Sequence, residues 1–302
     1  MSALLNALLL ATPLMVSPGP QAAQDTITPT FSWPAGTVLS GEASVETIQS
    51  QNGQEVPGQS LQVSLTRTIS DHPEGLVVAS EVEGQGADAI PAYVVTDDGE
   101  FVGVENVDGI VSRMREQLLA AARAQTGGTV PPEAEAMAER MFNAESVEAG
   151  AREEHELLVG LWNGVTFERN GTRFTSMDMQ EGVTQSVLPT EVEYVWLGFA
   201  PCAEGEAEDS CIELEATLFP DENALATAFE NVLTSQSPGT LFVNRAVQTR
   251  TVRILAQPDG LVPRQVVDQT EASFDIEAEG EIVELAITQT EEKTFTLGGG
   301  LN

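Results

Sequence analysis

Residues 271–279 run Glu-Ala-Ser-Phe-Asp-Ile-Glu-Ala-Glu and alternate without a break between polar and small or apolar side chains. Because successive side chains of a β-strand point to opposite faces, this stretch predicts a strand with one packed face and one wet face. Gly280 supplies a turn, after which a second strand keeps one apolar phase through Val283, Leu285, Ile287, Phe295 and Leu297. Residues 239–297 therefore predict long antiparallel strands, whose packed face needs a partner layer from the rest of the chain.

Further strands are predicted upstream, where turn-prone residue pairs separate β-like segments. Residues 61–70 alternate strictly, and they are linked to the strand predicted at 37–49 across Asn52-Gly53 and Pro57-Gly58. These turns indicate antiparallel neighbours in the same sheet.

A second local prediction concerns Asn170-Gly171, which lies between two β-like segments. An Asn-Gly pair favours a two-residue hairpin turn. Closing the turn in this way sets Phe167 opposite Phe174, ring against ring.

Helical spacing interrupts the β pattern at residues 108–126, 132–149 and 221–234. We expect the first two helices to belong to a helical insertion at about 108–158 that lies across the sheet. Their apolar stripes contain Met114, Leu118, Met137 and Met141. Such stripes are explained either as ordinary core or as the lining of a ligand groove.

These elements predict an α+β fold: a large curved antiparallel sheet, like an open half-barrel, with two or three helices packed on one face. We expect residues 24–302 to form a single β-rich domain. In element order (many long strands, a few interrupting helices, an export signal), most of the mature chain resembles the open half-barrels of periplasmic lipoprotein carriers of the LolA and LppX type.

The N-terminus has the features of an export signal. Ala3 to Val16 is an apolar run that is too short to span a bilayer, and the helix-breaking sequence Pro18-Gly19-Pro20 follows it. We therefore expect residues 1–23 to be a signal peptide and the mature protein to be extracytoplasmic, either periplasmic or secreted.

Cys202 and Cys211 are the chain's 2 cysteines, and they flank a polar loop. Metal binding would need further thiols or histidines nearby, and redox chemistry favours the closer C-x-x-C spacing. In an exported protein this pair predicts a structural disulfide.

The chain is strongly acidic, with 13 basic and 47 acidic residues and a net charge of −34. Nucleic acids and anionic membrane surfaces carry charge of the same sign, so the composition argues against both as partners. A solvated acidic surface explains this charge without a cation site, since no Ca²⁺-binding loop pattern is present. The oligomeric state is not predicted.

The sequence contains no catalytic motif. Of the 2 histidines, His72 precedes a proline in a turn, and His155 lies in Glu153-Glu154-His155-Glu156, where Val159 replaces the second ligand of a zinc-protease helix. We therefore predict no enzymatic activity, no metal site and no cofactor.

Arg67 and Arg250 fall in phase with apolar neighbours on their predicted strands. A guanidinium on an apolar face must pair with a carboxylate, reach the rim of the core, or await an anionic ligand. The first two possibilities make these residues structural. The third makes them contacts for an acidic head group.

Two hypotheses about function follow. The first is an exported binding protein that carries an apolar or amphiphilic ligand between sheet and helices, with Arg67, Arg250, Met114, Leu118, Met137 and Met141 as candidate contacts. The alternative is an acidic extracytoplasmic scaffold or protein-interaction domain, with a filled core and no small-molecule ligand.

Overall fold

The computed structural model describes residues 25–84, 90–181, 184, 186–236, 241–278 and 280–298. The predicted signal peptide, residues 1–23, and the last residue of the 271–279 stretch lie outside these ranges.

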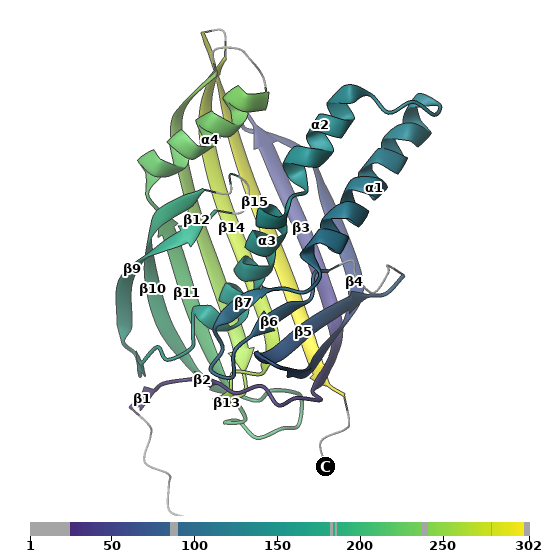
Figure 1. The fold of residues 1–302 in the computed structure, drawn as a ribbon. Helices are drawn as coiled ribbons and strands as arrows, with labels where there is room; N and C mark the ends of the chain where they lie inside the picture. Colours follow the sequence, from purple (N-terminus) through teal and green to yellow (C-terminus); the bar gives the residue numbers. More distant parts are fainter. Residues whose placement is uncertain are drawn as a thin grey trace, which may run out of the picture.

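A single large antiparallel sheet dominates the fold (Figure 1). Its strands are β3 (Val38–Gln51), β4 (Gln54–His72), β5 (Gly75–Val82), β6 (Tyr93–Val95), β7 (Phe101–Val104), β9 (Thr172–Gln180), β10 (Val187–Ala200), β11 (Cys211–Pro220), β12 (Leu241–Ala256), β14 (Pro263–Ala278) and β15 (Glu281–Leu297). These 11 strands lie in the order β7-β6-β5-β4-β3-β15-β14-β12-β11-β10-β9. The edge strands β7 and β9 do not pair with each other, so the sheet stays open.

Two small sheets lie beside the large one. Strand β1 (Thr26–Ile27) pairs with β8 (Phe167–Glu168), and β2 (Thr30–Phe31) pairs with β13 (Asp259–Gly260). They connect the start of the described chain to segments far along the sequence.

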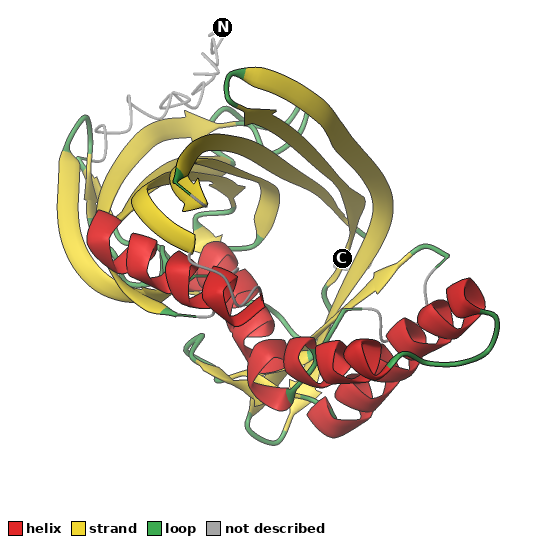
Figure 2. Ribbon diagram, turned by 90° about the horizontal axis from the view of Figure 1, so that it is seen from above, coloured by secondary structure: helices red, strands yellow, loops and turns green. Residues whose placement is uncertain are grey.

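The helices are α1 (Val107–Thr126), α2 (Pro132–Met141), α3 (Ala144–His155) and α4 (Glu222–Gln236), and a short π-helix, η1 (Glu156–Gly160), continues α3. The prediction of a broadly α+β fold with a large antiparallel sheet is confirmed. Figure 2 shows a strongly curved sheet with α3 and α4 across its open side. Helices α1 and α2 instead form an arm that extends away from the sheet (Figure 1).

The predicted helix at 132–149 is wrong in one respect, because two helices occupy this segment. The chain leaves the helical conformation at Phe142 and Asn143, and Asn143 then caps α3. The Asn143 side chain accepts a hydrogen bond from the Ser146 backbone N–H at 2.9 Å, and the Ser146 hydroxyl accepts one from the Asn143 N–H at 3.1 Å. This reciprocal capping box starts a new helix with its own direction.

The predicted alternation at 271–279 places Phe274 on the packed face of β14, where it is 4% exposed. Its cross-strand partner is Leu285 of β15, in the predicted apolar phase. Of the two turns predicted between β3 and β4, only Asn52-Gly53 reverses the chain. Pro57-Gly58 instead lies inside β4 at a bulge, where the register with β3 shifts between Thr47 and Gln49.

The hairpin predicted at Asn170-Gly171 is wrong in its pairing. The turn itself is present, with the Gly171 N–H donating to the Glu168 carbonyl at 3.0 Å. Phe167, however, is buried and pairs with Ile27, whereas Phe174 is 68% exposed and pairs with Glu193. The two segments thus separate after the turn because each has a different partner strand.

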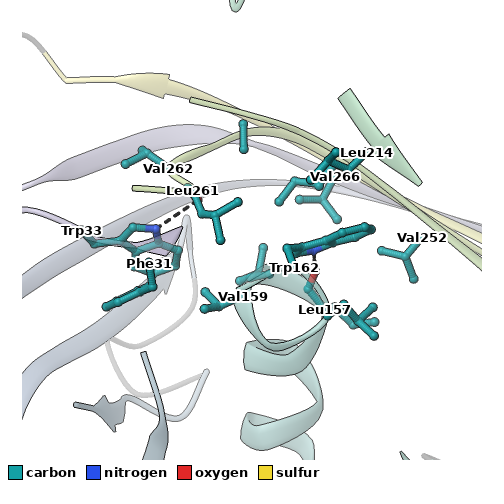
Figure 3. Close-up of a cluster of buried hydrophobic side chains, with 14 of the residues drawn as sticks. Phe31, Trp33, Leu157, Val159, Trp162, Leu214, Val252, Leu261, Val262 and Val266 are labelled. Carbon is teal, nitrogen blue, oxygen red and sulfur yellow. Dashed lines mark hydrogen bonds between the residues drawn. The ribbon is translucent and has the colours of Figure 1, made fainter. Parts of the chain in front are cut away.

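The largest core lies at the end of the sheet nearest η1 and the two small sheets (Figure 3). Trp162 is fully buried there, and its indole N–H donates to the Leu157 carbonyl at 2.8 Å. Trp33 donates in the same way to the Leu261 carbonyl at 3.0 Å. Because both indole donors are satisfied, the large rings can be buried without leaving a polar group unpaired.

A second core packs α4 onto the sheet. Leu225 and Ala228 of α4 lie among Val243, Ala246 and Phe274, and the rings of Phe229 and Phe274 are 4.5 Å apart. The concave face is thus filled at both ends, by different helices.

Candidate functional site

A cavity of about 760 Å³ lies between these two cores. Its floor is the concave face of the central strands, among them β3, β4, β12, β14 and β15, and helices α3 and α4 contribute further walls. This volume falls within the roughly 300–1,000 Å³ typical of small-molecule sites.

Much of the cavity wall is apolar. Phe229 of α4, Phe274 of β14 and Leu188 of β10 line the end nearest α4. A second apolar wall comes from β3 and β4 and includes Val45, Leu61, Val63 and Leu65. Of these, Leu61 is 58% exposed, which is unusual for a leucine on the inner face of a sheet. The cavity therefore offers apolar surface that the protein itself does not cover.

The wall formed by α3 is ionic. The adjacent residues Glu153 and Glu154 reach in different directions, Glu153 to Arg250 of β12 and Glu154 to Arg67 of β4. Strands β3, β15 and β14 lie between β4 and β12 in the sheet. Helix α3 is therefore tied to two well-separated strands, across the central floor of the cavity.

Arg67 is almost completely buried, with 1% of its side chain exposed. Besides Glu154, it donates from Nε to the Ser80 hydroxyl at 3.1 Å, and its guanidinium carbon lies 5.4 Å from the centre of the Phe295 ring. Burial by itself lowers the pKa of Arg67, but the charge of Glu154, the charge of Tyr93 and the Glu154 hydrogen bond together outweigh burial and raise the pKa. For Glu154, burial raises the pKa, but the charges and hydrogen bonds of Arg67 and Lys293 lower it by a larger amount. The net pKa of Glu154 therefore lies below its ordinary value.

Arg250 binds Asp268 of the neighbouring strand through two parallel hydrogen bonds, 2.9 Å from Nε and 2.7 Å from Nη2. Its Nη1 lies 2.6 Å from Glu153. Burial lowers the pKa of Arg250, but the hydrogen bonds and charges of Asp268 and Glu153 raise it well above its ordinary value. Two-pronged pairing of this kind fixes the plane of a guanidinium.

Both predicted arginines thus line the cavity, and each has a carboxylate partner. Of the alternatives left open by the sequence, the structure shows the ion pair. The third possibility, that they await an anionic ligand without a carboxylate partner, is wrong, because Glu153, Glu154 and Asp268 already pair with them. Lys293, the only lysine in the sequence, joins the same network at 3.7 Å from Glu154 and 3.1 Å from Glu291.

The structure places the four predicted lining residues of the helical arm elsewhere. Met137 and Met141 are 47% and 49% exposed on α2, and Met114 packs against a small cluster around Ile110 and Val147. Neither these three nor Leu118 is among the described residues that line the cavity. The reason is the break at Asn143, which lets α3 take the inner position while the arm points outward.

The two histidines lie in different surroundings. His155 is buried with 1% exposure, and its Nε2 lies 2.8 Å from the Gly99 carbonyl oxygen. Burial lowers the pKa of His155, although the Gly99 hydrogen bond opposes this. His72 lies 3.1 Å from Glu105 near the surface. Within the described ranges, no cluster of three or more His, Cys, Asp or Glu side chains could hold a metal ion.

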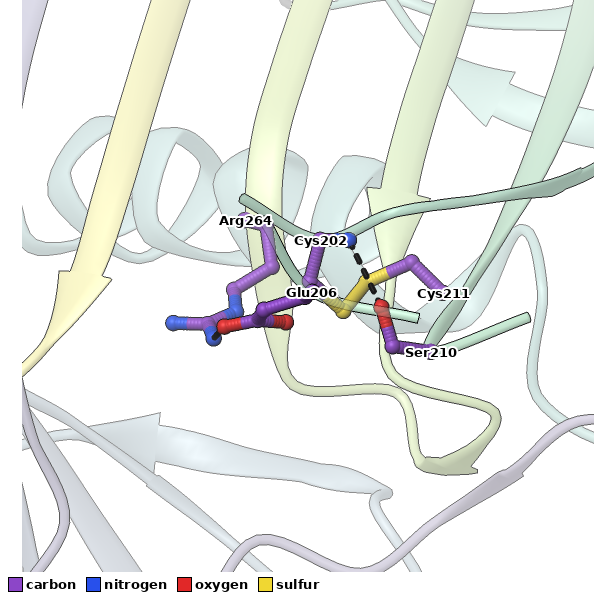
Figure 4. The surroundings of a disulfide bond; sticks show 5 residues. All are labelled: Cys202, Glu206, Ser210, Cys211 and Arg264. Carbon is purple, nitrogen blue, oxygen red and sulfur yellow. Dashed lines mark hydrogen bonds and ion pairs between the residues drawn. A yellow bond between two sulfur atoms is a disulfide. The ribbon is translucent and has the colours of Figure 1, made fainter. Parts of the chain in front are cut away.

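The predicted disulfide between Cys202 and Cys211 is confirmed (Figure 4). It closes the loop between β10 and β11, where the Cys202 N–H donates to the Ser210 hydroxyl at 2.8 Å. Arg264 of β14 reaches Glu206 of the same loop at 3.3 Å. Among the described residues, no helix is both long enough and apolar enough to cross a membrane.

No protein-family model matches the chain, and no curated protein matches it significantly. Among solved structures, lipovitellin, in a structure that concerns its lipid-protein interactions, is similar to this chain. The alignment covers 90% of this chain and 26% of the lipovitellin chain, at 10% identity and a TM-score of 0.42. The attachment invasion locus protein Ail of Yersinia pestis, in complex with the heparin analogue sucrose octasulfate, aligns with 87% of this chain and 100% of its own, at 5% identity and a TM-score of 0.14. The chain thus spans about a quarter of the lipovitellin chain (26%), and TM-scores this low carry no argument about function.

Proposed function

We propose that this chain is an exported, non-enzymatic carrier that holds an apolar or amphiphilic ligand between the concave face of its sheet and helices α3 and α4. The observation that carries the proposal is the cavity of about 760 Å³ between two separately packed cores. A protein that needed only a stable core would gain by covering the apolar side chains that line this space, since burying apolar surface stabilises a fold.

Two features support a built cavity rather than a packing defect. Its apolar wall includes side chains from β3, β4, β10, β14 and α4, which are brought together only by the curvature of the sheet. Its ionic wall holds α3 in place through paired charges, so the helix is fixed without its side chains filling the space below. The alternative of a scaffold with a filled core has no comparable support.

Export is the second part of the proposal. The apolar N-terminal run and the disulfide between Cys202 and Cys211 both fit an oxidising, extracytoplasmic compartment. The acidic surface would keep such a carrier away from anionic membranes and nucleic acids.

Mass spectrometry of organic extracts tests this function. The mature protein is purified without detergent from the exported compartment of its source, extracted with organic solvent, and compared with a mock purification. We expect one extracted compound in stoichiometric amount. Extracts that match the mock purification, from protein whose cavity is empty in a crystal structure, would support the scaffold instead.

A further inference from the structure

Five uncharged polar side chains form a belt across the floor of the cavity. These are Thr47 and Gln49 of β3, Gln248 of β12, Thr270 of β14 and Gln289 of β15, and all five line the cavity. We call them the polar belt. Their positions between the apolar end at α4 and the ionic network at α3 give the cavity three chemically different zones.

Strand register brings the members of the polar belt close together. Thr270, Gln289 and Thr47 are direct cross-strand neighbours in one row, and Arg250 ends this row on β12. Gln248 and Gln49 occupy the adjacent row, separated by Ala272 and Ile287. Cross-strand neighbours on one face lie roughly 5 Å apart, so the belt can surround a group of a few atoms.

The polar belt has unused hydrogen-bonding capacity. None of its five side chains makes a hydrogen bond to another described residue, although the three amides and two hydroxyls supply both donors and acceptors. An entirely apolar ligand seated on the belt would strip these groups of water and leave them unpaired, which is unfavourable. Uncharged oxygen atoms in the ligand would satisfy them.

The ionic network argues against an anionic head group. Its basic members Arg67, Arg250 and Lys293 face four carboxylates, those of Glu153, Glu154, Asp268 and Glu291, so one negative charge is in excess. Every one of these carboxylates also has a basic partner already. A cationic head group would have to compete with an arginine or the lysine for each of them.

We infer that the ligand is an amphiphile with an uncharged, oxygen-rich head group, such as a glycerol ester or a glycoside. This inference rests on the proposed carrier function and specifies its ligand class. The apolar tail lies toward Phe229 and Phe274, and the head group binds the polar belt beside the α3 network.

Amphiphiles that share one twelve-carbon chain test this inference. Calorimetric titration of the delipidated mature protein, below the micelle concentrations, compares 1-monolauroylglycerol and dodecyl glucoside with laurate and dodecyltrimethylammonium. We expect at least one uncharged compound to bind roughly tenfold more tightly than either charged one. The better of the two uncharged compounds indicates whether the head group is a glycerol or a sugar.

A belt variant, Thr270→Val with Gln289→Leu, removes polar groups while keeping the side-chain size. We expect it to bind the preferred uncharged compound roughly tenfold more weakly, with little change for laurate. The control is Gln269→Leu with Thr288→Val, which makes the same changes on the opposite face of β14 and β15, and it should bind like the wild type. Thermal unfolding of both variants verifies that they are folded.

The outcomes separate this inference from the carrier function. Binding without head-group preference, tighter binding of laurate or of the cation, or full affinity in a folded belt variant would overturn the ligand class alone. Failure of all four compounds to bind the wild type would overturn the ligand class and the carrier function together.

Discussion

Arg67 and Glu154, 87 positions apart in the chain, form an ion pair that joins strand β4 to helix α3 inside the protein. Together with the pair formed by Glu153 and Arg250, it ties one helix to two strands with three others between them. At roughly 4.8 Å between strands, β4 and β12 are about 19 Å apart along the sheet, so the two pairs also restrain its curvature. The two ion pairs thereby hold helix α3 in a fixed position over the floor of the cavity.

The Arg67–Glu154 pair gives an asymmetric prediction for stability. Glu154→Gln leaves the buried Arg67 without its charge partner and is expected to cost on the order of 3 kcal/mol of unfolding free energy. Arg67→Met should cost less, because Glu154 is 18% exposed and keeps Lys293 at 3.7 Å. Arg67→Met with Glu154→Leu should recover part of the loss.

Chemical denaturation of these variants provides the measurement. Arg253→Met is the control, since Arg253 is 49% exposed in its pair with Glu215 and its removal should cost at most about 1 kcal/mol. Equal losses for Glu154→Gln and Arg253→Met would show that the buried pair has no special role.

Part of the fold and of the cavity wall is encoded in local sequence patterns and was predictable. The alternation around Phe274 fixes which side chains of β14 face inward, and the placement of Arg67 among apolar neighbours signals a buried charge that needs a partner. The identity of that partner was not predictable, because the tertiary fold alone brings Glu154 to β4. The polar belt was missed for the same reason: its members lie on four strands and share no sequence pattern.

Other errors had a recognisable signal. Asn143 followed by Ser146 matches a reciprocal helix cap, which could have divided the helix predicted at 132–149. The pairing of Phe167 with Phe174 failed because the partners β1 and β10 compete with the local turn, and no local rule weighs such competition.

Stability should depend on pH through His155. Its folded-state pKa is lowered, so the unfolded chain takes up a proton more readily, and the unfolding free energy should fall as the pH drops below the ordinary value of 6.5. His155→Gln should flatten this part of the profile. Urea unfolding between about pH 8 and pH 5 measures this, and parallel profiles for the wild type and His155→Gln would contradict it.

At still lower pH, Glu154 adds a second loss. Its pKa is held below the ordinary 4.5, so its contribution is present above that value and disappears as the pH falls through the folded-state pKa. When the urea unfolding series is extended below pH 4.5, Glu154→Gln should lack this acidic loss of stability, and an unchanged loss would contradict the assignment to Glu154.

The disulfide should contribute about 2–3 kcal/mol, because it closes a short loop with a sequence separation of 9. We expect Cys202→Ala with Cys211→Ala to lower the unfolding free energy by that amount without changing the fold. Thiol labelling of denatured, unreduced protein should detect no free cysteine. Full labelling of protein from the exported compartment would refute the bond.

The net charge of −34 should make the protein sensitive to salt. Self-repulsion destabilises the compact state, and sodium chloride screens it, so the melting temperature should rise between low and moderate ionic strength. Calcium chloride at equal ionic strength should add little. A large calcium-specific rise would instead indicate a cation site.

Native mass spectrometry of a cavity-blocking variant tests the carrier account most directly. Ala272 lies on the cavity floor, whereas the exposed Ala286 lies on the opposite face of the neighbouring strand. We expect the wild type and Ala286→Trp to carry one bound organic molecule that is released on collisional activation, and Ala272→Trp to carry none. Wild-type protein without a bound molecule, or a folded Ala272→Trp that retains it in full, would contradict the account.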